Sequence, residues 1–116
     1  VQEVSKAWEE LNHKGYMIVF GSSADTPVKA STWMYPTEKK ALRAYCRQIS
    51  QKSSGDQPWP IKMTYIAPGH IHTPKQDEKH PTRKKLDCDY IASVVKWLLS
   101  QPDDVNISEI CFDRKV

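Results

Sequence analysis

The sequence predicts an α/β fold, a partial doubly wound parallel sheet of about three strands with about three helices covering both faces. Helical and strand patterns alternate along the chain, ending on a strand. This alternation favours right-handed crossovers between parallel strands. The first strand pattern, residues 17–20, is apolar throughout instead of alternating, so both of its faces need cover. With 116 residues, the chain is expected to form a single domain over residues 1–116.

The first helix is predicted over residues 2–13. Its apolar residues fall at i, i+3, i+4 and i+7, which places them on one stripe: Val4, Ala7, Trp8 and Leu11. Gly15 is the expected stop just beyond this helix, because glycine adopts the left-handed conformation of many helix ends. The strand at 17–20 then ends in a small polar turn that begins at Gly21.

The second helix is predicted to begin near Pro36, whose ring suits a first helical turn, and to run to about residue 51. The second strand is expected over residues 61–67, where apolar and β-branched side chains dominate. Pro68 and Gly69 close that strand.

A long polar loop is expected over residues 70–85, followed by the third helix with Asp87 as its N-cap. Leu86 and Ile91 have the spacing of a hydrophobic staple. The apolar stripe of this helix consists of Ile91, Val94, Val95, Leu98 and Leu99. Residues 107–112 predict the last strand.

Composition excludes several classes of protein. Apolar residues make up 39% and charged residues 27% of the chain, as in a soluble globular domain. The longest apolar run has four residues, whereas a membrane span needs about 20. No signal-peptide pattern is visible, and the start at Val1 instead of Met indicates processing or a fragment. Three cysteines without Cys-x-x-Cys spacing favour reduced, inert thiols and a cytoplasmic location.

The charge is concentrated in one segment. Residues 75–85 hold five basic and two acidic side chains, which accounts for the whole net charge of +3. A nucleic-acid binder would spread Lys and Arg along a face with aromatic residues between them, so nucleic acid is not an expected partner. A solvated charged loop is the favoured interpretation, and recognition of an anionic ligand is the alternative.

Candidate functional residues follow the ends of predicted strands. Ser22 and Ser23 follow the first strand, and the carboxyl ends of parallel strands share one edge at which ligands bind. Tyr35 and Lys39 are four residues apart, on one face of the second helix. An ammonium beside a phenol favours the phenolate, so this tyrosine could move a proton at a substrate oxygen. A surface tyrosine beside a solvated lysine is the alternative.

Taken together, these motifs resemble the carboxyl-terminal half of the short-chain dehydrogenase/reductase family, over essentially the whole chain. That resemblance implies a Rossmann-like sheet. The matching positions are residues 18–23, Tyr35 with Lys39, residues 61–69 with Ile71 and Thr73, and residues 89–92, 97–100 and 105–110.

The resemblance implies a role for each matching residue. Tyr35 would be the general acid/base, and Lys39 would hold the nicotinamide ribose. Ser23, or Ser22 if the following loop is one residue shorter, would orient the substrate oxygen. The nicotinamide carboxamide would lie against a segment containing Pro68, Gly69, Ile71 and Thr73. The implied reaction is hydride transfer between NAD or NADP and a small-molecule carbonyl or alcohol. Because residues 74–85 are charged, a polar or anionic substrate is expected.

The chain also departs from the family pattern. Ala24 and Asp25 follow the serine pair where a small residue is common, and Pro36 is unusual directly after the tyrosine. None of the four glycines forms a Gly-rich phosphate turn, and the family's amino-terminal half is missing. We therefore expect either an amino-terminal partner chain or self-association through the free edge of the strand at 17–20. The alternative function is a catalytically silent relative that serves as a structural or interaction subunit.

Two further pairs of residues have two interpretations each. His70 and His72 could bind a metal from an extended segment, but no further ligand is evident, so loop histidines are favoured and no metal site is predicted. Trp33 and Met34 either line a substrate pocket or pack at the sheet edge.

Overall fold

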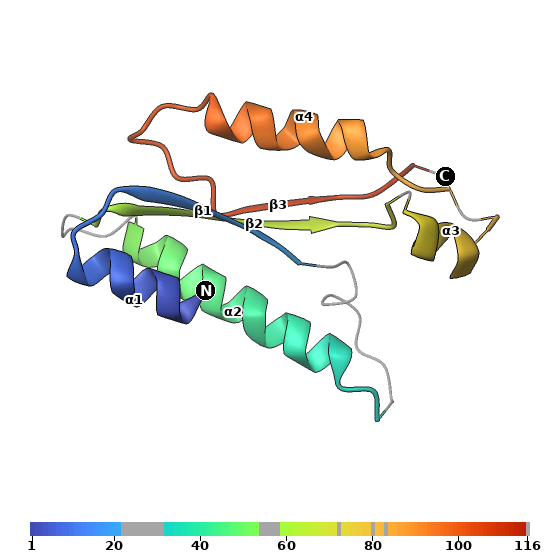
Figure 1. The fold of residues 1–116 in the computed structure, drawn as a ribbon, viewed down its shortest axis with the longest axis horizontal. Helices are drawn as coiled ribbons and strands as arrows, with labels where there is room; N and C mark the ends of the chain where they lie inside the picture. Colours follow the sequence, from blue (N-terminus) through green and yellow to red (C-terminus); the bar gives the residue numbers. More distant parts are fainter. Residues whose placement is uncertain (22–31, 54–58, 72, 80, 83, 116) are drawn as a thin grey trace.

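The computed structural model describes residues 1–21, 32–53, 59–71, 73–79, 81–82 and 84–115 (Figure 1). The predicted α/β class with parallel strands is confirmed. In chain order the elements are α1 (Gln2–Glu10), β1 (Gly15–Phe20), α2 (Tyr35–Ser53), β2 (Ile61–Pro68), α3 (Pro74–Lys79), α4 (Cys88–Leu99) and β3 (Glu109–Phe112).

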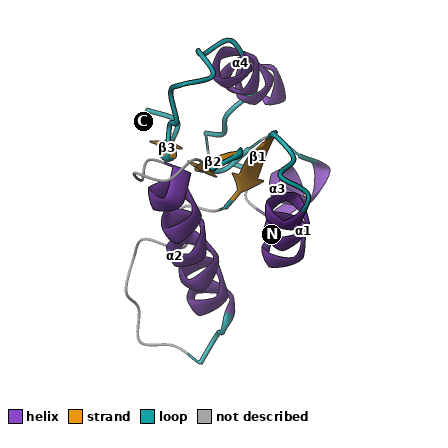
Figure 2. Ribbon diagram, turned by 90° about the vertical axis from the view of Figure 1, so that its left-hand side faces the viewer, coloured by secondary structure: helices purple, strands orange, loops and turns teal. Residues whose placement is uncertain are grey.

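The sheet has three strands in the order β1-β2-β3, and both neighbouring pairs are parallel. Gly15 pairs with Ile61 at the start of β1, and Tyr65 pairs with Glu109 at the start of β3. Helices α1 and α2 lie on one face of the sheet and α4 lies on the other (Figures 1 and 2). The central strand β2 is therefore covered on both sides.

The core lies between α2 and the sheet. Met63 and Tyr65 of β2 have no exposed surface, and Cys46 of α2 is 1% exposed. These three residues and Ala67 form one cluster, against which partly buried side chains pack: Met17, Val19, Leu42 and Ile49. On the opposite face, Leu98 of α4 is completely buried. Alternate residues of β2 thus serve two cores, as its continuous apolar character requires.

Two predictions about the first helix and the strand after it are corrected. The helix ends at Glu10 instead of residue 13, and Asn12, with φ of 50°, takes the left-handed conformation predicted for Gly15. Asparagine tolerates this conformation because its short amide can bond to nearby backbone. Gly15 instead begins β1, where a Cβ would collide with the Trp8 ring.

The predicted polar loop at 70–85 contains a short helix, α3. The Thr73 hydroxyl accepts a hydrogen bond from the Gln76 backbone N–H at 3.2 Å, and Pro74 occupies the first helical position. Threonine followed by proline is a helix-start signal that the high charge of this segment concealed. Figure 1 shows α3 beyond the carboxyl end of β2.

Two predictions near the carboxyl terminus need adjustment. Leu99, assigned to the apolar stripe of the third helix, is 62% exposed, because α4 ends at this residue. The last strand begins at Glu109 instead of residue 107, since the Asn106 side-chain oxygen accepts the Met63 N–H bond at 2.9 Å. Asp87 is the N-cap of α4, as predicted, although its side chain makes no capping hydrogen bond. No helix in the described part of the chain could span a membrane.

Candidate active site

Tyr35 and Lys39 lie together at the amino-terminal end of α2. Tyr35 is the first helical residue, and the Lys39 Nζ lies 5.5 Å from the centre of its ring. The indole of Trp33 stacks on the Tyr35 ring, with ring centres 5.1 Å apart and planes inclined by 20°. Trp33 is 63% exposed and Met34 is 60% exposed, so neither is buried at the sheet edge. Tyr35 and Lys39 themselves are partly exposed.

The last residue of β2 and the segment after it contain the four residues assigned to the nicotinamide: Pro68, Gly69, Ile71 and Thr73. Pro68 is the buried last residue of the strand, and the Gly69 N–H donates to the Phe112 carbonyl at 2.8 Å. A Cβ on residue 69 would collide with the Asp113 carboxylate, which explains the glycine. Ile71 forms a parallel bridge with Leu86, and Thr73 begins α3. This turn is thus held by β3 and by the segment before α4.

Polar contacts attach α3 to the same region. The His70 Nδ1 lies 3.0 Å from the Gln76 Oε1, and the Lys85 ammonium pairs with Asp77 at 3.2 Å. The Lys85 side chain is only 2% exposed, which corrects the expectation that all of this charged segment is solvated. His72 lies outside the described residues, and the described part of the chain holds no group of three or more metal-ligating side chains.

The structure places the predicted site in two parts. The amino-terminal end of α2, with Tyr35, and the turn after β2, with Gly69, both lie toward the carboxyl end of the sheet (Figure 1). The predicted substrate-orienting serines, Ser22 and Ser23, lie outside the described residues, as do Ala24 and Asp25.

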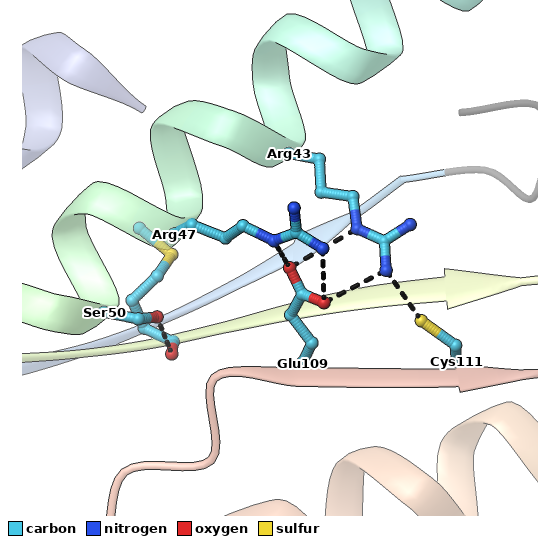
Figure 3. Close-up of polar contacts among 6 residues, drawn as sticks. Arg43, Arg47, Ser50, Glu109 and Cys111 are labelled. Carbon is cyan, nitrogen blue, oxygen red and sulfur yellow. Dashed lines mark hydrogen bonds and ion pairs between the residues drawn. The ribbon is translucent and has the colours of Figure 1, made fainter. Parts of the chain in front are cut away.

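Sequence reasoning missed a charged cluster that links α2 to β3, which we call the arginine clamp: Arg43, Arg47 and Glu109. The Arg43 Nη2 lies 3.0 Å from one Glu109 oxygen, and the Arg47 Nε bonds to the other (Figure 3). Arg43 also donates to the Cys111 sulfur at 3.3 Å. Hydrogen bonds from Arg43, which have the larger effect, and from Arg47 lower the pKa of the Glu109 carboxyl to about 2. The i+4 spacing of the two arginines was the available signal.

Comparison with known proteins gives relatives but no matching family model. An uncharacterised oxidoreductase of Staphylococcus aureus strain MW2 is 31% identical over 97 residues, which cover 83% of this chain and 41% of the relative. The chain therefore spans about two fifths of the length of the curated relatives it matches.

Solved structures share the fold. A serine dehydrogenase complexed with NADP+ superimposes with a TM-score of 0.74 at 21% identity, covering 96% of this chain and 48% of that one. A mutant 4-hydroxyisoleucine dehydrogenase complexed with NADH and succinate gives 0.76 at 21% identity, with 97% and 51% covered. A protein described as a member of the short-chain dehydrogenase/reductase family gives 0.73 at 19% identity, with 97% and 49% covered. The chain thus has the sheet and helices of about half of such a protein.

Proposed function

We propose that this chain supplies the catalytic, carboxyl-terminal half of an oxidoreductase of the short-chain dehydrogenase/reductase type. The reaction is hydride transfer between NAD or NADP and a carbonyl or alcohol group of a small, polar or anionic molecule. The observation that carries this proposal is the Tyr35–Lys39 pair, partly exposed at the start of a helix that packs on a parallel sheet. The fold of enzymes that were solved with NADP+ and NADH supports the same conclusion.

The donors in this chain fit the nicotinamide end of such a cofactor. A phenol, an ammonium and the Thr73 hydroxyl are groups that hydrogen-bond a ribose or a carboxamide. When bound, the cofactor supplies the hydride. Tyr35 then donates a proton to the substrate oxygen, or accepts one from it in the reverse direction, and Lys39 holds the nicotinamide ribose. Ser23 or Ser22 orients the substrate oxygen, and Pro68, Gly69, Ile71 and Thr73 form the wall against the carboxamide.

A matched pair of tyrosine variants tests this role. Tyr35→Phe should lower nicotinamide-dependent turnover by about 100-fold or more, because it removes a positioned acid/base. Tyr45→Phe, on the same helix, should change turnover less than twofold. The measurement is steady-state oxidation of NADH or NADPH by the protein in an assembly that shows activity. Near-full activity of Tyr35→Phe would refute the acid/base assignment, and no activity in any assembly would favour a silent structural subunit.

The complete site requires residues that this chain does not contain. The chain has no Gly-rich turn for the pyrophosphate and spans about two fifths of its curated relatives. Among the described residues, no strand pairs with the outer edge of β1, and Phe20 at the end of β1 is 46% exposed. We expect this edge to receive an amino-terminal partner segment, or a second copy of the chain, because unpaired strand edges invite pairing.

Sedimentation equilibrium of the 13.4 kDa chain at micromolar concentration checks this expectation. A complex should form with the partner segment or with a second copy. A cooperatively melting monomer whose stability does not rise when the partner segment is added would contradict it.

The three free cysteines fit a reducing compartment, so we expect the protein in the cytoplasm.

A further inference from the structure

The amino-terminal and middle turns of α2 share one line of residues. Tyr35, Lys39, Arg43 and Arg47 succeed one another at intervals of four, so they form a single ridge along the helix surface. The first two members are the proposed catalytic pair, and the last two belong to the arginine clamp. Whatever sets the rotation of the helix at the clamp therefore sets the direction of the catalytic pair.

The clamp restrains α2 differently from the apolar core. Cys46 packs against β2, and the Ser50 hydroxyl donates to the Met63 carbonyl at 3.0 Å, so both attach the helix to one strand. The clamp attaches it to the next strand, because Glu109 belongs to β3 (Figure 3). Met17 and Val19 of β1 pack against the same cluster, so these contacts hold the helix over β1 and β2. The clamp adds an attachment to β3, on the other side of β2, and so restrains the rotation of the helix about β2.

The clamp is well suited to this restraint. Each arginine places two nitrogen atoms near the Glu109 carboxylate, and these paired contacts fix direction as well as distance. Arg43 and Glu109 are mostly covered, at 15% and 20% exposed, so water competes little for their bonds. The Arg43 guanidinium also lies 5.8 Å from the centre of the buried Tyr65 ring.

The distance between the arginine clamp and Tyr35 makes the restraint on α2 important at the candidate active site. At about 1.5 Å of rise per residue, Tyr35 lies about 12 Å along the helix from Arg43. A tilt of about 5° at the clamp would therefore move Tyr35 by about 1 Å. A misplacement of about 1 Å can cost about 100-fold in turnover.

We propose that Arg43, Arg47 and Glu109 are positioning residues: by holding α2 to β3, the arginine clamp orients the Tyr35–Lys39 pair at the carboxyl edge of the sheet. This inference rests on the proposed function for its catalytic consequence, but the orientation of the helix can be measured without any reaction.

The first measurement is structural and uses this chain. Spin labels are introduced through non-natural residues at positions 38 and 96, which are exposed on α2 and α4, leaving the native thiols unmodified. Wild type should give one narrow distance distribution by pulsed electron resonance. Glu109→Gln, which removes the charge but keeps the shape, should shift or broaden it by about 1.3 Å, the displacement that a tilt of about 10° causes at position 38, about 7.5 Å along the helix from Arg43. Glu9→Gln, which breaks the exposed ion pair between Lys52 of α2 and Glu9 of α1, is the matched control and should leave the distribution unchanged.

The second measurement is catalytic and uses the active assembly. Glu109→Gln should lower kcat about 10-fold and leave the cofactor KM within twofold. The primary deuterium isotope effect on kcat with 4-deuterated nicotinamide should rise, because misplacement slows the hydride step. A variant that merely loses folded protein would keep the wild-type isotope effect. Glu9→Gln should match wild type in all three quantities.

The outcomes separate the two proposals. An unchanged distance distribution in Glu109→Gln would overturn the clamp's orienting role, whatever the activity. A changed distribution with unchanged kcat and isotope effect would show that the clamp supports only the fold, and would also overturn the inference. If wild type has no nicotinamide-dependent turnover in any assembly, the proposed function fails, and the spin-label distances alone decide whether the clamp orients the helix.

Discussion

The two ends of α2 differ in what surrounds them. Residues 42–50 are attached to the sheet by buried and partly buried side chains, by the arginine clamp and by the Ser50 hydrogen bond. Residues 35–39 contribute no member to the core cluster, and the described ring contacts of Tyr35 are with Trp33 and Lys39. One helix thus combines a firmly packed segment with an accessible end that carries the proposed chemistry.

Under the proposed function, this difference lets a small sheet orient Tyr35 and Lys39 while both stay partly exposed. A proton-transferring tyrosine must reach a substrate, so it cannot be packed as Cys46 is. Rigidity reaches it along the helix, because an α-helix is stiff over a few turns. Substitutions in the packed segment should therefore reduce stability, and substitutions at the accessible end should reduce function. The predictions below test that separation in order of expected size.

The largest effect on stability is expected in the core beneath the packed segment. Met63→Ala should lower the free energy of unfolding by about 3 kcal/mol, because it leaves a cavity where a side chain with no exposed surface now lies. Met34→Ala, just before the accessible end, should change it by less than about 0.5 kcal/mol, since Met34 is 60% exposed. Urea denaturation followed by circular dichroism measures both. Similar losses for the two variants would contradict the comparison.

A pH-dependent effect of intermediate size is expected from the clamp. The pKa of Glu109 is lowered to about 2 from an ordinary value of 4.5, so its ionised form stabilises the fold. This stabilisation is fully present above about pH 5 and is lost as the pH falls through the folded-state pKa of about 2. We expect about 1–2 kcal/mol at pH 7, below the full value of the shift because Arg47 is 57% exposed and water screens its charge.

The measurement compares wild type with Glu109→Gln in urea between pH 7 and pH 2. The stability difference should be largest at pH 7 and should shrink steadily below about pH 4.5. Glu9→Gln, whose partner Lys52 is 53% exposed, should show almost no difference at any pH. A Glu109→Gln difference that persists unchanged at pH 2 would mean that packing, and not charge, explains the effect.

The smallest effect is expected from a single hydroxyl. Ser50→Ala should cost about 1 kcal/mol, because Ser50 is 3% exposed and its hydroxyl donates to the Met63 carbonyl. Ser93→Ala on α4 removes an exposed hydroxyl whose bond, to the Tyr90 carbonyl, lies within its own helix, so its loss should be nearly neutral. Both changes share the same gain in helix propensity, which cancels in the comparison. Equal stability of the two variants by thermal melting would contradict a stabilising hydrogen bond between the Ser50 hydroxyl and β2.

The sequence by itself determined the class of fold and the order of its main elements. The apolar stripe of α4 repeats with the period of a helix, and the continuous apolar run of β1 indicates a strand that is covered on both faces. Both patterns are local, so they can be recognised without the tertiary structure. The spacing of Tyr35 and Lys39 likewise predicted that they share a helix face, because four residues make about one turn. The short helix α3 was not predicted, because the high charge of its segment favours a loop, whereas Thr73 and Pro74 carry the signal of a helix start.

Tertiary structure alone decided which charges are paired and which are buried. Nothing local distinguishes Glu109 from any other acidic residue at a strand start, and its two arginine partners lie 66 and 62 positions earlier in the chain. The burial of Lys85 against Asp77 also depends on α3 folding beside the turn after β2. Such pairs form when parallel strands and a crossover helix bring distant segments side by side. The spacing of apolar residues along the chain determines which face of a helix is covered. Only the assembled sheet determines which charged side chains lie beside that helix.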